Sequence, residues 1–417
     1  MEELARESIS LLARSASHAD PPRLGSFGAV FIMLKSALGA GLLSFPWAFE
    51  KAGGVTIAIS VELVCLIFLI SGLVILGYTS CVSRQKTYQD VVREVCGRAM
   101  GQLCEVCFCF NLFMVSVAFL VVVQDQLEKC KSHQNNHHYI GEVPYHWYTD
   151  QGFTLFIICL IIILPLSIPK EISIQKYTSV LGTLAATYLC VAVIVRYFQL
   201  GSHMAIITPE HNQGSWTSMF SVVPTICFGF QCHEACIAIY SSMENQKLSH
   251  WVVIAVVSMF FCLLIYTLTE LLIMSVNGTK AELICIICIL TPNILLLCVW
   301  NRSVILNLML RVQRRRRGIV THSFESYCRV VLTVIWISVT FVIAMFVPDM
   351  GKVISVIGGI SSFFIFIFPG LCLVFTMQTE TATPVILTVW GVITIVVGAF
   401  VFGQSTTIAV MQVFHAF

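Results

Sequence analysis

Residues 35–47 read KSALGAGLLSFPW and interrupt a stretch of chain that is otherwise apolar and long enough to cross a membrane. Gly39, Gly41 and Pro46 lie in this interruption, together with small or hydroxylated residues. In lipid, every unpaired backbone N–H or C=O group is costly, so a spanning helix is broken only where the freed groups are used. The ends of the two half-helices point their partial charges at an ion or a zwitterion. This stretch therefore predicts a membrane carrier.

The composition agrees with this prediction, because the 417 residues are 57% hydrophobic and only 11% charged. Soluble proteins carry about 25% charged residues, and a spanning helix needs roughly 20 apolar residues. We therefore predict an all-α integral membrane protein with one membrane domain at 26–411, a cytosolic tail at 1–25 and a short extracellular C-terminus at 412–417. The eleven expected spans are 26–48, 55–81, 102–127, 151–169, 175–198, 216–240, 251–275, 282–308, 328–347, 353–376 and 384–411.

The distribution of charge sets the expected orientation. Lys and Arg are concentrated in the N-terminal tail and in the segments 82–100 and 302–329, which predicts a cytosolic N-terminus. The basic run at 311–317 has no interleaved aromatic residues, so it indicates a cytoplasmic loop or an anionic-lipid contact, and no nucleic-acid partner is expected. Nearly all of the 18 cysteines fall inside expected spans, where free cysteine behaves as a small hydrophobe.

A second interruption lies in the sixth expected span, where residues 224–234 read PTICFGFQCHE. Gln231, His233 and Glu234 would lie near the middle of the membrane, and polar residues there are functional by default. The two interruptions are five spans apart, which predicts two inverted five-helix repeats plus one extra helix, with a substrate site between the broken helices. His233 and Glu234 are either a proton-sensitive or substrate-facing pair or a hydrogen-bonded packing pair. Because neighbours on a helix lie about 100° apart, both face the cavity only if the helix unwinds.

Three further features of the spans carry weaker expectations. Glu62 and Glu270 also lie within spans, each as an interior polar partner, although Glu270 is near an end and could reach water. The paired glycines Gly358 and Gly359 in the tenth span are expected to be hinge or packing elements.

Two stretches resemble a known family. AVFIMLKSALGAGLLSFPWAFEKAGG at 29–54 and FGFQCHEACIAIYSSM at 228–243 are similar to the matching spans of the sodium-coupled neutral amino acid transporters (systems A and N), within the amino acid/auxin permease group. The resemblance extends from about residue 25 to 402. It implies eleven spans, a plasma-membrane location and secondary active uptake of small neutral amino acids such as glutamine, alanine or asparagine. Sodium is the implied co-substrate, and no other cofactor is expected.

The resemblance also assigns roles to single residues. It places backbone contacts to the substrate carboxylate at residues 38–41, where amides at a half-helix N-terminus would bind an anion and glycines would allow close approach. The alternative is that these are small-residue packing positions. The predicted substrate-binding residues are Ser36, Leu38, Gly39, Ala40, Gly41, Phe228, Gly229, Gln231 and His233.

For the ion, the resemblance points to Lys35, which occupies the position of an asparagine that binds sodium in the family, and to Thr291. An ammonium group has no acceptor and cannot coordinate sodium. Lys35 either faces the cytosolic side with its charge in water, or it replaces the ion as a tethered cation that could shed its proton when buried. The predicted ion-coupling residues are Lys35, Thr291 and Glu234, with no metal beyond sodium.

The leading hypothesis is a sodium-driven carrier of neutral amino acids that works by alternating access. The alternatives are an amino-acid-binding membrane sensor without transport, or a proton-coupled or sodium-independent carrier. The spans contain no converging nucleophile and base, so no catalytic residue and no enzyme activity are predicted. The expected partners are a neutral amino acid, sodium or a proton, and membrane lipid, and a monomer is the default.

Overall fold

The computed structural model describes residues 24–38, 45, 55–137, 151–167, 188, 191, 195, 216–273, 322–347, 350–379 and 385–414. Within these ranges the chain is helical, and the β interaction recorded there is an isolated bridge between Leu24 and Met243. The all-α prediction is confirmed. The expected spans at 175–198 and 282–308 lie almost wholly outside the described residues, so the expected number of eleven spans stays a prediction.

Seven helical segments of the described part are long and apolar enough to cross a membrane. They are α4 (Val55–Ser83), α6 (Arg98–His137), α10 (Trp216–Gly229) with α11 (His233–Ser242), α12 (Leu248–Ile273), α14 (His322–Phe346), α15 (Met350–Ser362) continuing through the π-helical η4 (Phe363–Ile367) into α16 (Phe368–Thr379), and α17 (Val385–Phe414). Shorter elements are α2 (Ser26–Ala37), α5 (Tyr88–Cys96), α7 (Gln151–Ile158), η2 (Cys159–Ile163) and α8 (Leu164–Ser167).

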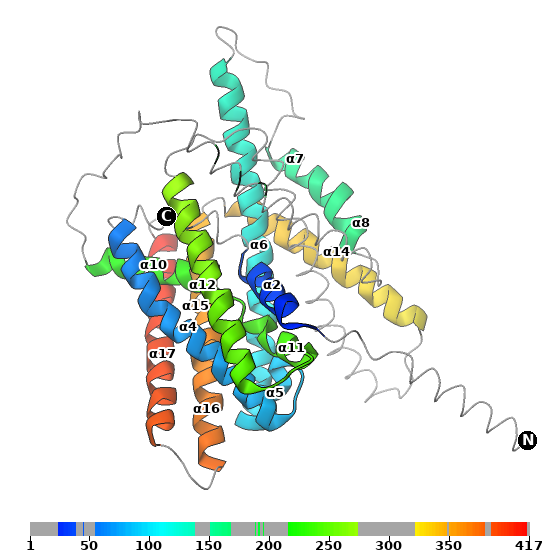
Figure 1. The fold of residues 1–417 in the computed structure, drawn as a ribbon. Helices are drawn as coiled ribbons and strands as arrows, with labels where there is room; N and C mark the ends of the chain where they lie inside the picture. The colour runs from blue at the N-terminus through cyan, green and yellow to red at the C-terminus, as the bar shows by residue number, and fades with distance from the viewer. Residues whose placement is uncertain are drawn as a thin grey trace, which may run out of the picture.

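Both expected interruptions are present as helix ends. In the first expected span, helix α2 ends at Ala37. The sixth expected span is divided into two helices, because α10 ends at Gly229 and α11 begins at His233 (Figure 1). For the other described spans, the bounds expected from the apolar pattern lie close to the observed helix bounds. The exception is α6, which extends to His137, beyond the expected end at 127.

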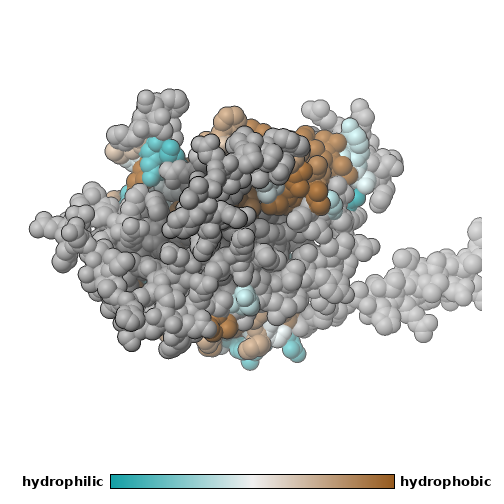
Figure 2. Space-filling model, turned by 90° about the horizontal axis from the view of Figure 1, so that it is seen from above, coloured by the Kyte–Doolittle hydropathy of each residue, from teal (hydrophilic) through white to brown (hydrophobic). Residues whose placement is uncertain are grey.

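The outer helices expose apolar side chains, as expected of surfaces that contact lipid. Phe260 on α12, Ile335 on α14 and Val396 on α17 are each more than half exposed. Figure 2 shows such side chains gathered in a broad brown patch. Because soluble monomers rarely expose large contiguous apolar patches, this surface supports the membrane assignment.

The interior brings the tenth expected span against the broken sixth. Helix α15 packs on α10 and α17, and it meets α10 at Pro224. A Cβ atom built on Gly358 would lie 2.4 Å from the backbone oxygen of Pro224, so only glycine permits this approach. Of the two expected roles for Gly358, hinge or packing, the contact supports packing.

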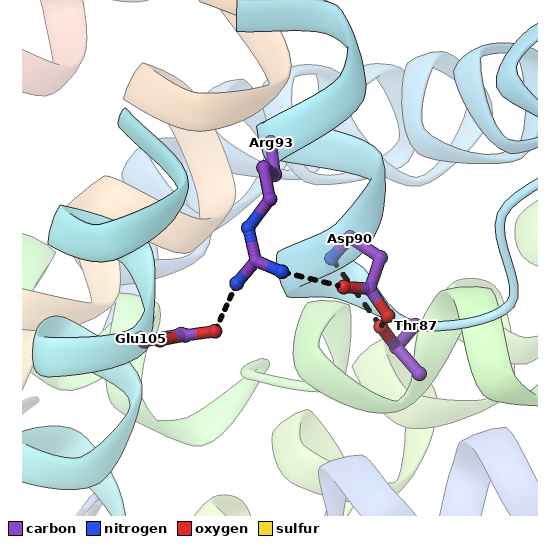
Figure 3. Close-up of polar contacts among 4 residues, drawn as sticks. All are labelled: Thr87, Asp90, Arg93 and Glu105. Atoms are coloured by element: carbon purple, nitrogen blue, oxygen red, sulfur yellow. Dashed lines mark hydrogen bonds and ion pairs between the residues drawn. The ribbon is translucent and has the colours of Figure 1, made fainter. Parts of the chain in front are cut away.

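A polar network fixes the short helix α5 to α6 (Figure 3). The Thr87 hydroxyl accepts a hydrogen bond from the Asp90 backbone N–H at 3.3 Å and so caps α5. Arg93 lies 3.3 Å from the Asp90 carboxylate and also pairs with Glu105 on α6. On the buried side, the Tyr88 hydroxyl donates to the Phe364 carbonyl at 3.0 Å. Burial raises the pKa of the Tyr88 phenol well above its usual range, so it stays a neutral donor.

The start of α2 meets the link between α11 and α12 at one end of the bundle. The Leu24 N–H donates to the Ser242 carbonyl at 2.9 Å, and the Glu244 N–H donates to the Leu24 carbonyl at 3.1 Å. The Ser26 hydroxyl also lies 2.6 Å from Nε2 of His250. The start of α2, the end of α11 and the start of α12 therefore share one side.

The contact at Gly358 gives a first prediction. Gly358→Ala should lower the melting temperature of the detergent-solubilised protein, because the added methyl overpacks α15 against α10 at a cost of about 1–3 kcal/mol. Gly403→Ala on α17 is the matched control, since a Cβ atom there meets nothing within 4 Å. Equal melting temperatures for the two variants would contradict the packing role.

Candidate functional site

The first interruption ends helix α2, so the last carbonyls of this helix have no N–H partner in a following turn. Helix α2 buries Ala29, Met33 and Ala37 on one face, and its last turn closes when the Leu38 N–H donates to the Leu34 carbonyl at 2.8 Å. Leu38 has extended backbone angles, with φ −73° and ψ 97°, so the helix does not continue through it. The predicted residues Gly39, Ala40 and Gly41 lie outside the described residues.

The second interruption is a short turn with irregular pairing. The Phe230 N–H donates to the Ile226 carbonyl at 3.0 Å, as in a regular α-helix. The Gln231 N–H instead donates to the Phe228 carbonyl, and this hydrogen bond is longer, at 3.4 Å. Helix α11 then begins at His233. The Gly229 carbonyl, at the end of α10, has no N–H in the next turn of the same helix to pair with.

One side chain joins the two interruptions. The Tyr266 hydroxyl, on α12, lies 3.0 Å from the Ala37 carbonyl and 2.8 Å from the Gly229 carbonyl. Tyr266 is fully buried. Its single proton is therefore donated to one of these carbonyls at a time or shared between both. Sequence reasoning missed Tyr266. The signal available was a tyrosine inside an apolar span, since a buried tyrosine hydroxyl needs a partner and broken helices supply carbonyls.

Aromatic rings pack closely around this junction. The ring of Phe45 stacks on Tyr266 with centroids 4.3 Å apart and meets Phe230 edge-on at 6.0 Å. A Cβ atom on Gly229 would lie 2.1 Å from the Phe45 ring, so glycine is required where this ring touches the end of α10. The two broken spans are thus in direct contact at their interruptions.

The polar residues of the second interruption point to three different helices. Oε1 of Gln231 accepts a hydrogen bond from the Ser361 hydroxyl on α15 at 2.6 Å. Nε2 of His233 lies 3.0 Å from the Leu69 carbonyl on α4 and donates to it, since a carbonyl only accepts. Oε1 of Glu234 accepts from Nδ2 of Asn111 on α6 at 2.8 Å.

These contacts separate His233 from Glu234, so the two side chains do not form a hydrogen-bonded pair with each other. Helix α11 is regular from His233 onward, as expected if adjacent residues point in different directions. Neighbouring polar atoms still lack partners: Nε2 of Gln231, Nδ1 of His233 and Oδ1 of Asn111 are buried without a hydrogen bond in the described part. These three atoms comprise one donor and two acceptors.

The remaining predicted residues lie around the end of α2 or elsewhere. Lys35 is half-buried in the last turn of α2 and forms no ion pair with the described residues, and Ser36 is exposed. Phe228 is buried in the last turn of α10. Thr291 lies outside the described residues. The described ranges hold no cluster of three or more His, Cys, Asp or Glu side chains suited to a metal ion.

Solved structures of other transporters share this fold. A crystal structure of MhsT in complex with L-phenylalanine aligns with 91% of this chain and 98% of its own, with a TM-score of 0.51 and 14% sequence identity. A manganese transporter of Eremococcus coleocola aligns with 93% of this chain and 86% of its own, with a TM-score of 0.51 and 10% identity. These identities support a shared fold alone.

Sequence relatives are closer. A protein of Xenopus tropicalis named "Putative sodium-coupled neutral amino acid transporter 8" is 57% identical, with full coverage of both chains. Solute carrier family 38 member 8 of Mus musculus is 48% identical over 99% of this chain and 100% of its own. Sodium-coupled neutral amino acid transporter 7 of Danio rerio is 40% identical over 95% of this chain and 90% of its own.

The family model described as "Transmembrane amino acid transporter protein" matches residues 23–411, which include both interruptions and all the helices assigned above except the last residues of α17. The relatives are transporters and not enzymes, and the apolar helices agree with a multi-pass membrane protein. The chain therefore belongs to the transmembrane amino acid transporter family, in the branch of the sodium-coupled neutral amino acid transporters.

Proposed function

We propose that this protein carries small neutral amino acids of the glutamine, alanine and asparagine class across the membrane by alternating access, driven by a sodium gradient. The observation that carries the proposal is the junction of the two interruptions, where one Tyr266 hydroxyl contacts the Ala37 and Gly229 carbonyls. A contact that depends on the relative position of two broken helices is suited to change when one repeat moves against the other.

The charges of the half-helix ends suit a zwitterion. Helices α2 and α10 both direct the C-terminal, partially negative end of their dipoles at the junction, where an ammonium group or sodium is favoured. Helix α11 begins there, and its partially positive N-terminus favours a carboxylate. The backbone amides of residues 39–41 would add to the carboxylate side, whereas the Leu38 N–H already donates to the Leu34 carbonyl. The Gln231 and His233 nitrogens that have no hydrogen bond in the described part would contact the rest of the substrate.

Sodium coupling is supported by the names of the relatives, which are called sodium-coupled neutral amino acid transporters. In this chain Lys35 lies in the last turn of α2, where the helix dipole favours a cation. We assign ion coupling to Lys35, Glu234 and Thr291.

The protein would act as a monomer in the plasma membrane, with its N-terminus in the cytosol and its C-terminus outside. The contact between the start of α2 and the link from α11 to α12 is consistent with the expectation that both lie on one side of the membrane.

Uptake in sodium and in choline tests the proposal. Cells that express the full chain should take up radiolabelled glutamine and alanine faster in sodium than in choline, because the ion and the substrate stabilise the same occluded state. No uptake in either medium, with the protein demonstrated at the cell surface, would contradict transport and favour the sensor alternative.

Lys35→Asn in the same assay tests the ion site. If Lys35 leaves the ion site free, the parent and the variant should both depend on sodium. Uptake that ignores sodium in the parent but requires it in the variant would mean that the ammonium group replaces the ion. In that case the sodium-driven mechanism is wrong for this chain, although transport itself stands.

Tyr266→Phe tests the junction. Removing the hydroxyl leaves two buried carbonyls without this donor, at a cost of about 1–3 kcal/mol, so the maximal uptake rate should fall about 5- to 150-fold if the contact is needed in only part of the cycle. Tyr240→Phe is the matched control, because it removes a tyrosine hydrogen bond to the Gln246 carbonyl, away from the interruptions. An equal loss of uptake in both variants at equal surface expression would show that the effect is general destabilisation.

A further inference from the structure

The carboxyl group of Glu62, on α4, is buried without a partner. Glu62 is 1% exposed, and neither of its carboxyl oxygens has a hydrogen bond to any residue the structure describes. A buried carboxylate without a counter-charge or donor is strongly destabilising in a low-dielectric interior. The group is therefore either neutral in this packed arrangement or paired with a ligand.

The position of Glu62 follows from the antiparallel packing of α4 and α12. Nε1 of Trp251 donates to the Leu73 carbonyl at 2.9 Å, which fixes the register of the two helices. The same number of residues separates Glu62 from Leu73 and Trp251 from Cys262. Cys262 accordingly lies within electrostatic range of the Glu62 carboxyl.

This register places Glu62 close to the junction of the broken helices. Tyr266 follows Cys262 by one helical turn, about 5–6 Å, and lies on the same face of α12. Cys262, which lies within electrostatic range of the Glu62 carboxyl, is therefore one turn before the residue whose hydroxyl contacts the Ala37 and Gly229 carbonyls.

Two thiols interact electrostatically with the Glu62 carboxyl. Cys65 lies on the same face of α4, and Cys262 faces it from α12. Cys227 on α10 lies beside Cys65. None of these thiols is a cation.

None of the charged and titratable groups named below, on the other helices that the structure describes, pairs with the Glu62 carboxyl. On α11, His233 donates to the Leu69 carbonyl and Glu234 accepts from Asn111. On α16, Cys372 lies 3.7 Å from Cys96. Lys35 on α2 forms no ion pair in the described ranges.

A proton suits this environment better than a metal cation does. A hard cation such as sodium is held by several oxygen ligands, and thiols are soft ligands that suit it poorly. No described hydroxyl or amide donates a hydrogen bond to the Glu62 oxygens. A single proton neutralises a carboxylate without any further ligand.

We propose that Glu62 binds and releases a proton during the transport cycle. In the packed arrangement Glu62 is the neutral acid, and when the helices part and water enters it loses the proton to become the carboxylate. Proton binding thus favours the closed state that the substrate also favours, and the proton moves in the same direction as the amino acid. This step rests on the proposed function and adds a proton to the sodium and the substrate.

The test uses the full chain in proteoliposomes with a trapped pH dye and radiolabelled alanine. In the parent, uptake should rise as the external pH falls, by at most about tenfold per pH unit, the limit for one proton. The lumen should acidify as alanine enters. Glu62→Gln should abolish both the pH dependence and the acidification, and Glu62→Asp should restore them in part because it keeps a carboxyl group. Glu94→Gln is the matched control, because Glu94 is exposed on α5.

Infrared difference spectra between acid and alkaline buffers provide a readout that does not require transport. The carboxylic acid band of the parent should lose one component in Glu62→Gln and none in Glu94→Gln. If the parent fails to transport alanine but this component is present, the proposed function fails and the proton site stands. An unchanged acid band, or a pH profile and acidification that persist in Glu62→Gln, would overturn the proposal. A higher half-saturating sodium concentration in Glu62→Gln with unchanged acidification would identify Glu62 as a sodium ligand instead, and would also overturn it.

Discussion

Every backbone polar group inside a membrane protein needs a partner within the protein, and the two broken helices are the places where this chain does not supply one by its own helical pairing. The Ala37 and Gly229 carbonyls end their helices there, and Tyr266 supplies the missing donor to both. The close contact of the Phe45 ring with Gly229 depends on the same junction. The positions of α2, α10 and α12 are thereby tied to one hydroxyl group.

The polar interior around this junction is divided into satisfied and unsatisfied groups. His233 and Glu234 each reach a neighbouring helix, which attaches α11 to α4 and to α6. Gln231 is attached to α15 through Ser361, but its buried amide nitrogen and both carboxyl oxygens of Glu62 have no hydrogen bond within the part of the chain that the structure describes. In a native fold such orphaned groups call for an explanation, and in a transporter a ligand that comes and goes supplies one.

Close packing and polar contacts connect the helices around the junction. Gly358 allows α15 to touch the backbone of α10 at Pro224, and the network of Thr87, Asp90, Arg93 and Glu105 ties α5 to α6. Alternating access requires one part of the bundle to move as a unit against another. The contacts away from the junction are close, whereas at the junction one Tyr266 hydroxyl is shared between two carbonyls. This arrangement permits such a movement.

The sequence by itself determined the class of the protein, its apolar spans and the two interruptions, because hydropathy and helix-breaking residues are local properties of the chain. It also identified the family through the stretches at 29–54 and 228–243, which the full-length relatives confirm. Only the tertiary structure decided which groups the polar side chains contact. His233 and Glu234 are adjacent in the sequence, and the regular helix directs them toward different neighbours, as their spacing of about 100° predicts, but the identity of those neighbours comes from the packing. Tyr266 and Glu62 gained importance from the register of α12 against α4 and from the meeting of two distant helix ends, which no local pattern encodes.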